Sequence, residues 1–366
     1  MNKKKIIFLL HLPPPHHGAS AVGMQLKNSQ LIKRKFNVTF YNISTSKSLN
    51  FSLLKSLLLF IKKTISIFRL LNKNQPDLIY YTMTSKGIAF IKDFFIVFLL
   101  TRKYKKIVLH FHNKGVKNNN NFYFRPLYKY IFRKCHVILL SEKLSYDVED
   151  YDLYKSLNFC PNGISFPKSV NKELNSQHKK YDFLFLSNLI IEKGVVDFIK
   201  ACEKLKELCK EGFRAAIVGK PADISIDELK AMVQEHNLLN YIDVLGPLYN
   251  DEKVNIFKNS KVFVFPTYYH YECFPLVIIE AMSFKLPIIS TNEGAIEDLI
   301  INGFNGLIAR KKDFTNLCSK MHLLLMDSNK IEIMGKNSYK HYNNNFTEGH
   351  FYNNFVNVLN NILDYE

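Results

Sequence analysis

The sequence predicts an α/β protein of two domains, each built on a doubly wound parallel sheet. Short apolar runs of strand composition alternate with amphipathic helical stretches along the chain. The length of 366 residues exceeds what one hydrophobic core normally serves, which favours two domains. Several apolar runs lead into loops rich in Pro, Gly or polar residues, and open parallel sheets bind ligands at this end of their strands.

The first half of the chain supplies five predicted strands and four helices. The strands are expected at 6–12, 37–41, 77–82, 107–111 and 136–140, and the helices at 21–33, 51–71, 86–100 and, as a short one, after Ser141. The helix at 51–71 has apolar residues over more than half of its circumference, with Lys and Arg interspersed. Such a helix either packs in a groove or lies on a membrane surface.

The second half repeats this alternation after a polar stretch. Strands are expected at 181–186, 213–219, 242–248, 262–266 and 287–291, and helices at 195–210, 225–237, 251–259, from about 275, 313–327, 330–342 and 346–363. Residues 165–180 have no apolar periodicity and are expected to link the domains. The predicted domains are therefore 1–164 and 181–345, followed by a terminal helix at 346–366.

Charge is distributed unevenly between the two halves. Residues 1–175 carry 29 Lys and Arg against 8 Asp and Glu, a net of +21, whereas residues 176–366 carry 21 against 24, a net of −3. The basic half predicts an anionic partner. No motif typical of nucleic-acid binding is present, so we expect an anionic membrane surface and no nucleic acid. Solubilising charge without a partner is the alternative explanation.

The cysteines and the amino terminus bear on the compartment. The six cysteines are scattered without metal-binding spacing, as in a reducing cytoplasm. The amino-terminal apolar run is brief and ends in a His and three prolines, so we interpret it as a strand and not as a signal peptide. The uncharged run at 94–100 is far shorter than the ~20 residues of a membrane span.

The most informative stretch is residues 268–291, between two predicted strands. A helix is expected to begin near Pro275, because proline fits the first helical turn. The backbone N–H groups of Leu276 and Val277 then lack helical acceptors and lie at the positive end of the helix dipole. This arrangement predicts a phosphate-binding site.

Two glutamates bracket this helix end. Glu272 precedes it and Glu280 lies within it, and carboxylates at these places can accept hydrogen bonds from sugar hydroxyls. With Phe274 and Pro275 after the first glutamate, the stretch resembles the donor-site motif of retaining GT-B glycosyltransferases, most closely glycosyltransferase family 4. An ordinary strand–turn–helix with surface glutamates is the alternative.

The resemblance extends to the first loop of the second domain. The family has Gly-Arg-Leu and then Lys-Gly here, and its Arg and Lys bind the donor diphosphate. Lys193 and Gly194 match, whereas Asn188 stands in place of the Arg. The resemblance therefore implies either that another basic residue, such as Lys220, supplies the missing charge or that the donor binds more weakly.

Two positions of the first domain match the family more loosely. Gly18 corresponds to the glycine-rich loop over the donor diphosphate, and His112 to a histidine beside the donor sugar. His16 and His17 could touch an acceptor or have no role. His110 lies on the same strand face as His112, but no third ligand stands near them, so we expect no metal and no cofactor.

These matches together imply a GT-B fold of two Rossmann-like domains facing across a cleft, with the terminal helix returning to the first domain. The implied function is retaining, metal-independent transfer of a sugar from a nucleotide-sugar, expected to be a UDP-sugar, to a glycan or lipid-linked acceptor. Surface polysaccharide or lipopolysaccharide synthesis is the expected context. The expected location is the cytoplasm, peripherally on the inner face of the cell membrane. The alternatives are a GT-B sugar-nucleotide epimerase and a non-enzymatic basic protein that binds membrane or nucleic acid.

Overall fold

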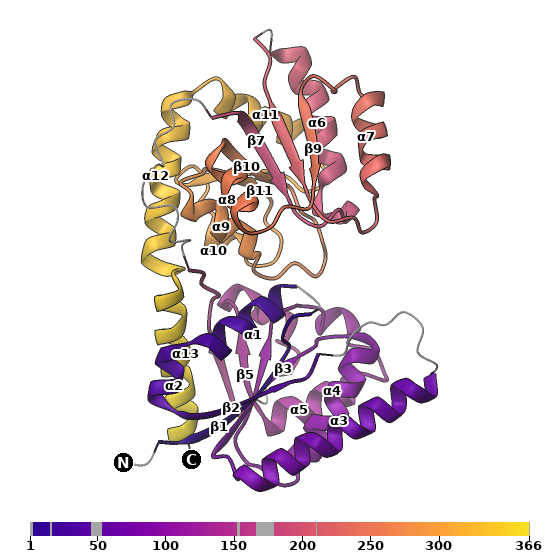
Figure 1. The fold of residues 1–366 in the computed structure, drawn as a ribbon, viewed down its shortest axis with the longest axis vertical. Helices are drawn as coiled ribbons and strands as arrows, with labels where there is room; N and C mark the ends of the chain where they lie inside the picture. The colour runs from indigo at the N-terminus through magenta and orange to yellow at the C-terminus, as the bar shows by residue number, and fades with distance from the viewer. Residues whose placement is uncertain are drawn as a thin grey trace. The chain divides into compact units, whose positions relative to one another are not determined.

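The chain forms two compact units, each with a six-stranded parallel sheet (Figure 1). The computed structural model describes residues 3–14, 17–44, 53–151, 154–165, 179–209 and 211–365. Unit 1 comprises Met1–Asn162 and Phe351–Glu366, and unit 2 comprises Gly163–His350. Most of the expected linker, residues 166–178, lies outside the described residues.

Unit 1 has the strand order β2-β1-β3-β4-β5-β6. Its strands are β1 (Lys5–Leu10), β2 (Asn37–Asn42), β3 (Leu78–Met83), β4 (Ile107–Phe111), β5 (His136–Leu139) and β6 (Ser156–Phe159). Its helices are α1 (Gly18–Asn28), α2 (Gln30–Lys35), α3 (Leu53–Asn74), α4 (Gly87–Thr101), η1 (Lys117–Asn119), α5 (Arg125–Lys134) and η2 (Glu142–Asp147). Central strands β3 and β4 are buried along their whole length, which explains their predominantly apolar composition.

The terminal helix α13 (Glu348–Asp364) belongs to unit 1 from Phe351 onward. The ring of Phe355 lies 6.2 Å from that of Phe8 on β1 and 5.3 Å from that of Tyr80 on β3. Lys106, just before β4, donates a hydrogen bond to the carbonyl of Leu363. Aromatic burial therefore fixes this helix against the sheet of unit 1.

The helix expected at 21–33 is wrong in its bounds and continuity. The structure begins α1 at Gly18 and breaks the run at Ser29, whose backbone is extended. The Ser29 hydroxyl accepts a hydrogen bond from the Ile32 N–H at 3.3 Å and so caps α2. Serine competes for backbone groups in this way, which favours helix ends over helix interiors.

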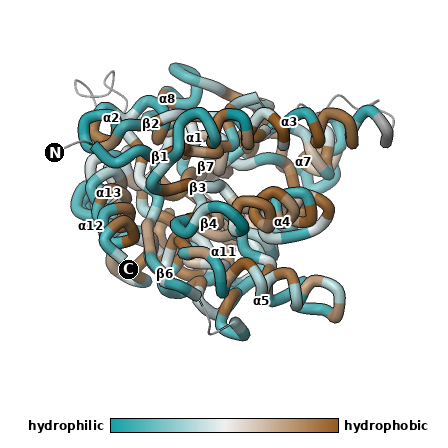
Figure 2. The backbone as a smooth tube through the Cα atoms, turned by 90° about the horizontal axis from the view of Figure 1, so that it is seen from below, coloured by the Kyte–Doolittle hydropathy of each residue, from teal (hydrophilic) through white to brown (hydrophobic). Residues whose placement is uncertain are grey.

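Helix α3 packs on unit 1 through one face only. Thr64, Ile67 and Leu71 are buried on this face, while Ile61 at its flank and Leu58 farther round the helix remain about half exposed. Among the described residues, no helix is long and apolar enough to cross a bilayer. Figure 2 shows apolar stretches along both α3 and α4.

Unit 2 has the strand order β12-β11-β10-β7-β8-β9. Its strands are β7 (Tyr181–Leu186), β8 (Ala215–Val218), β9 (Ile242–Gly246), β10 (Ser260–Phe265), β11 (Ile288–Ser290) and β12 (Gly306–Ile308). Its helices are η4 (Ile191–Lys193), α6 (Val195–Leu208), α7 (Ile226–Glu235), α8 (Asn250–Lys258), α9 (Leu276–Ser283), α10 (Ile296–Leu299), α11 (Phe314–Leu325) and α12 (Ser328–Asn345). Because all pairings are parallel, the loops that follow the strands gather at one edge of the sheet.

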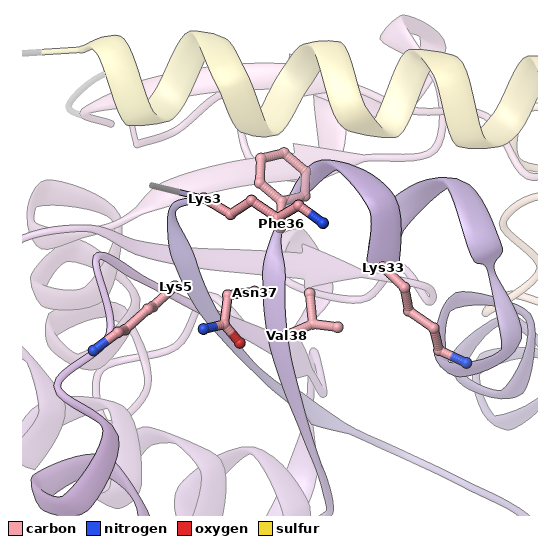
Figure 3. Close-up of a pocket in the computed structure, with 6 residues that line it drawn as sticks. All are labelled: Lys3, Lys5, Lys33, Phe36, Asn37 and Val38. Carbon is pink, nitrogen blue, oxygen red and sulfur yellow. The ribbon is translucent and has the colours of Figure 1, made fainter. Parts of the chain in front are cut away.

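In unit 1, a hollow opens at the edge of the sheet where strands β1 and β2 begin (Figure 3). It is lined by Lys3, Lys5, Lys33, Phe36, Asn37 and Val38. These residues come from the starts of β1 and β2 and the end of α2. No residue predicted for the functional site lines this hollow.

Candidate functional site

Helix α9 begins where the sequence predicts, at the carboxyl end of β10 in unit 2. Pro275 is its N-cap residue, and no side chain caps the helix end. Leu276 and Val277 form its first turn, so their N–H groups have no acceptor within the helix. Phe274 is buried and packs against Phe346, with ring centroids 5.8 Å apart. The helix end is thus held by an apolar anchor while its N–H groups keep their capacity to bind an anion.

Lys193 and Glu272 meet at this edge of unit 2. The Nζ of Lys193, at the end of η4, lies 3.1 Å from Oε2 of Glu272, and the two side chains are 19% and 9% exposed. Strands β7 and β10 pair in parallel, which brings the loops after them together. The ammonium also lies 5.6 Å from the ring centre of Phe265 and 5.3 Å from that of Tyr269. Aromatic faces on two sides favour a cation at this place.

Backbone contacts fix the two loops that carry this pair. The N–H of Tyr268 donates to the carbonyl of Glu192 at 2.8 Å. Gly194 follows Lys193 with φ of 87°, and a Cβ at this position would lie 2.4 Å from the carbonyl oxygen of Pro266. The Lys-Gly dipeptide therefore needs its glycine both for backbone conformation and for close approach to the loop after β10.

The segment Glu272–Cys273 is also held from the other side, by the loop after β11. The N–H of Ala295 donates to the carbonyl of Cys273 at 2.9 Å. Gly294 has φ of 59°, and a Cβ there would lie 2.4 Å from the carbonyl oxygen of Glu272. Glu272 is therefore positioned by backbone packing as well as by its ion pair.

Glu280 lies on α9 and pairs with a residue that the sequence analysis missed. The Nζ of Lys253, on α8, lies 2.7 Å from Oε1 and 2.6 Å from Oε2 of Glu280. Both side chains are about 30% exposed, so Glu280 keeps contact with solvent. No local sequence signal identifies Lys253, because the pairing depends on how α8 and α9 pack.

A second ion pair at the same edge was also missed. Buried Glu293, after β11, lies 2.8 Å from the Nζ of Lys311, after β12. The position of each residue just beyond an apolar run was the available signal. Lys193 and Lys311 thus place cations after β7 and β12, which are the first and last strands of unit 2 in chain order.

Asn188 lies at the carboxyl end of β7, where its side chain is exposed. The N–H of the next residue, Leu189, donates to the carbonyl of Lys220 at 2.9 Å. Lys220 is exposed as well and follows β8 through Gly219. The backbone of Lys220 thus lies beside the position where the family motif has its arginine.

The predicted residues of unit 1 gather among histidines at the carboxyl ends of β1 and β4. The rings of His110 and His112 are 4.1 Å apart, as their shared strand face predicts. The Nδ1 of His110 bonds with the Tyr80 hydroxyl at 2.7 Å, which gives this histidine a structural role. His11 and His17 lie close by, with ring centres 5.9 Å apart.

Burial keeps His112 and His11 neutral. Burial, with the nearby His11 and His17, lowers the pKa of His112 to about 3. Burial, with His17 and Lys63, lowers the pKa of His11 to about 4. The Nδ1 of His112 is buried and has no hydrogen-bond partner among the described residues. His112 is therefore a neutral imidazole, and its enclosed Nδ1 has unused hydrogen-bonding capacity.

Gly18 is the first residue of α1, and His17 is its N-cap. The Nδ1 of His17 accepts from the Ser20 N–H at 3.2 Å, so this histidine caps α1. A Cβ on Gly18 would meet no atom within 4 Å. The fold therefore does not itself require glycine at this position. Neighbouring His16 lies outside the described residues.

The sequence and the fold are both similar to those of known glycosyltransferases. Residues 168–341 match the family model described as Glycosyl transferases group 1. The capsular polysaccharide biosynthesis glycosyltransferase CapM of Staphylococcus aureus is 28% identical over 252 residues, which cover 64% of this chain and 63% of that protein. This chain thus spans less than two thirds of the length of that relative.

Two solved structures share the fold over nearly the whole chain. Sucrose-phosphate synthase from Thermosynechococcus elongatus has a TM-score of 0.77 at 16% identity, covering 100% of both chains. Anabaena HepE, in complex with UDP and glucose, has a TM-score of 0.70 at 17% identity, covering 98% of this chain and 100% of its own. The predicted fold class is confirmed. Residues 168–341 thus resemble the glycosyl transferases group 1 family, and by its two parallel sheets the chain has the GT-B fold.

Proposed function

We propose that this protein is a retaining glycosyltransferase that moves a sugar from a nucleotide-sugar to a glycan or lipid-linked acceptor. The observation that carries the proposal is the site at the carboxyl edge of unit 2. There the uncapped start of α9 and the Lys193–Glu272 pair occur within the region that matches the glycosyl transferases group 1 family. An anion site flanked by carboxylates suits a diphosphate that joins two polyhydroxylated groups.

Each residue receives a role from its chemistry. The N–H groups of Leu276 and Val277 and the ammonium of Lys193 bind the donor diphosphate, with Lys220 replacing the charge that Asn188 lacks. Glu280 accepts hydrogen bonds from the ribose hydroxyls, and Glu272 from the hydroxyls of the donor sugar. In unit 1, Gly18 contributes backbone to the diphosphate, and His112 contributes a neutral imidazole to the sugar.

The reaction breaks the bond between the anomeric carbon and the diphosphate oxygen and forms a bond from that carbon to an acceptor hydroxyl. The acceptor proton passes to the departing diphosphate oxygen on the same face of the sugar, which retains the anomeric configuration. Negative charge grows on the diphosphate as the bond breaks, and Lys193 with the α9 dipole stabilises that charge most in the transition state. No metal is needed in this scheme.

The donor and the context follow from the relatives. The HepE structure contains UDP, which supports a UDP-sugar donor. The CapM relative is named for capsular polysaccharide biosynthesis, which supports a role in surface polysaccharide or lipopolysaccharide synthesis. The net charge of +21 on residues 1–175 supports peripheral attachment to the anionic inner face of the cell membrane, where a lipid-linked acceptor would lie.

Thermal unfolding with UDP-, GDP- and ADP-sugars tests the donor site. A ligand at 100 times its dissociation constant stabilises the folded state by about 2.7 kcal/mol. We expect one nucleotide class to raise the Tm of the parent protein and not that of Glu280→Ala. Glu332→Ala is the matched control, because Glu332 also pairs with a lysine, Lys336, but lies on the exposed face of α12. No Tm shift with any donor would contradict the proposal.

Product analysis then tests the reaction. The proposal requires transfer to an acceptor with the anomeric configuration of the donor, observable by NMR of the product. An epimerase would instead change the nucleotide-sugar without an acceptor. A non-enzymatic basic protein would keep its function in Lys193→Ala and Glu272→Ala.

A further inference from the structure

Helices α3 and α4 of unit 1 present two apolar stripes to solvent. On α3, Leu57, Leu58, Ile61 and Ile65 are 43–53% exposed. On α4, Ile88, Ile91 and Phe95 are 47–74% exposed. Within each helix these positions fall at intervals of three, four or one, and so share one side of the helix. Side chains of this size are normally exposed singly, not in rows.

The two stripes lie next to one another. Phe95, itself 48% exposed, packs against Phe60 of α3 with ring centroids 6.0 Å apart. The stripes therefore form one surface, which we call the α3–α4 surface and define by the seven residues named above. Figure 2 shows the apolar stretches of both helices.

The segment that carries this surface is strongly basic. Residues 53–134 contain 17 Lys and Arg and 2 Asp and Glu. One of the two acids, Asp93 on α4, is buried and accepts hydrogen bonds from the Tyr81 hydroxyl at 2.8 Å and the Thr84 N–H at 3.0 Å. The other, Asp77, accepts from the backbone N–H of Lys5 at the amino edge of the sheet.

The basic residues stand beside the apolar stripes on the same helices. Lys55, Lys62 and Arg69 of α3 are exposed, and neighbouring α5 carries exposed Arg125, Lys129, Arg133 and Lys134 without any acid. Helix α5 packs on α4 through Tyr130, whose ring lies 5.2 Å from that of Phe98. An apolar strip bordered by cations matches the boundary between acyl chains and anionic headgroups.

We propose that the α3–α4 surface docks on an anionic phospholipid leaflet, with Leu58, Ile61, Ile88 and Ile91 entering the headgroup–acyl boundary. Lys62 and the basic residues of α5 then contact lipid phosphates. This inference rests on the proposed membrane attachment and assigns that attachment to a defined surface. The proposed donor residues at the start of α9 lie in unit 2, so donor binding can be tested separately. An apolar partner protein would not need the cations, and a second copy of this face would bring like charges together.

Vesicle co-sedimentation tests the surface with the full chain. The probes are phosphatidylcholine vesicles with and without about 30% phosphatidylglycerol, a content that gives the surface a negative potential. We expect binding to the anionic vesicles only. The triple variant Leu58→Gln, Ile61→Gln, Ile88→Gln should bind about tenfold more weakly or worse, because it loses the buried apolar area but none of the charge. Lys62→Glu should weaken binding most at low salt.

A matched control uses exposed apolar residues of unit 2. Leu323, Met326 and Ile333 are 41–58% exposed on or beside α11 and α12, and their triple Gln variant should bind as the parent does. Because all six positions are exposed, the Tm of each variant should stay near that of the parent, which separates lost binding from lost folding.

Three results would overturn the proposal. The first is unchanged vesicle binding by the α3–α4 variant, which would locate binding elsewhere in the basic half. The second is absence of vesicle binding by the parent protein. The third is a parent dimer that the α3–α4 variant converts to monomer, which would make the surface an interface between copies. Donor-induced Tm shifts measured on the same proteins would show independently whether the proposed transferase function stands.

Discussion

The Nζ of Lys193 lies 3.1 Å from Oε2 of Glu272, although the two residues follow different strands of unit 2. Glu272 is only 9% exposed, so its carboxylate has little contact with water to replace this partner. The pair therefore couples the stability of unit 2 to the residues proposed for catalysis. This coupling gives the first prediction.

Lys193→Ala should lower the free energy of unfolding by about 1–3 kcal/mol, because it leaves a largely buried carboxylate without its cation. It should also weaken donor binding. The double variant Lys193→Ala, Glu272→Gln should recover part of the lost stability but none of the transfer activity. Urea unfolding and a transfer assay provide the two measurements. Equal stability of the parent and Lys193→Ala would show that the pair is not coupled to folding.

Gly294→Ala should distort the site without touching any charged group. Its φ of 59° costs a non-glycine residue about 1–2 kcal/mol, and the added Cβ would lie 2.4 Å from the carbonyl oxygen of Glu272. The loop must then move away from Glu272, so we expect lower stability and reduced transfer. Gly349→Ala is the control, because its Cβ would meet ordinary contact at 3.8 Å. Similar behaviour of the two variants would contradict the explanation.

Gly18→Ala should separate folding from function in unit 1. The added Cβ meets nothing within 4 Å, and alanine favours a helix over glycine by at most about 1 kcal/mol. The Tm should therefore stay constant or rise slightly. If the backbone at this position approaches the donor diphosphate, the same variant should raise the KM for the donor. An unchanged KM would remove Gly18 from the proposed site.

Acid should destabilise unit 1 through its buried histidines. The pKa of His112 is lowered to about 3, that of His11 and His136 to about 4, and that of His110 is held well below its ordinary value, in each case mainly by burial. Below about pH 6.5 the unfolded chain takes up protons that the folded state does not. Stability should therefore fall as the pH drops from about 6.5 to 4, with each group adding up to about 1.4 kcal/mol per pH unit.

One buried acid opposes this trend. Burial raises the pKa of Asp93 to about 6, so between pH 4 and 6 the folded state holds a proton that the unfolded chain releases. Its contribution to stability is therefore lost as the pH rises through this window. Because the histidines outnumber it, the net slope should follow them. Unfolding midpoints across pH 4–7 measure the slope, His112→Gln should flatten it, and a midpoint that rises on acidification would refute it.

The sequence by itself determined most of the elements and their order, but it missed helix α5 and the edge strands β6 and β12. Predominantly apolar runs such as 107–111 and 181–186 match β4 and β7, because a strand that is mostly buried on both faces has few polar positions. The start of α9 at Pro275 was also predictable, since proline and the preceding motif act locally. The predicted helix bounds were wrong where a side chain competes for backbone hydrogen bonds. At Ser29 the first helix ends, and the Ser29 hydroxyl caps the next one.

Only the tertiary structure decided which charged residues meet. Lys253 is brought to Glu280 by the packing of α8 and α9, and Lys311 to Glu293 by the pairing of β11 with β12. Neither pair has a fixed sequence spacing, because ion pairs between elements depend on sheet order and not on local periodicity. The same reason applies to the α3–α4 surface. Amphipathicity left α3 with two interpretations, and only the packing of Thr64, Ile67 and Leu71 shows which face is buried and which meets solvent.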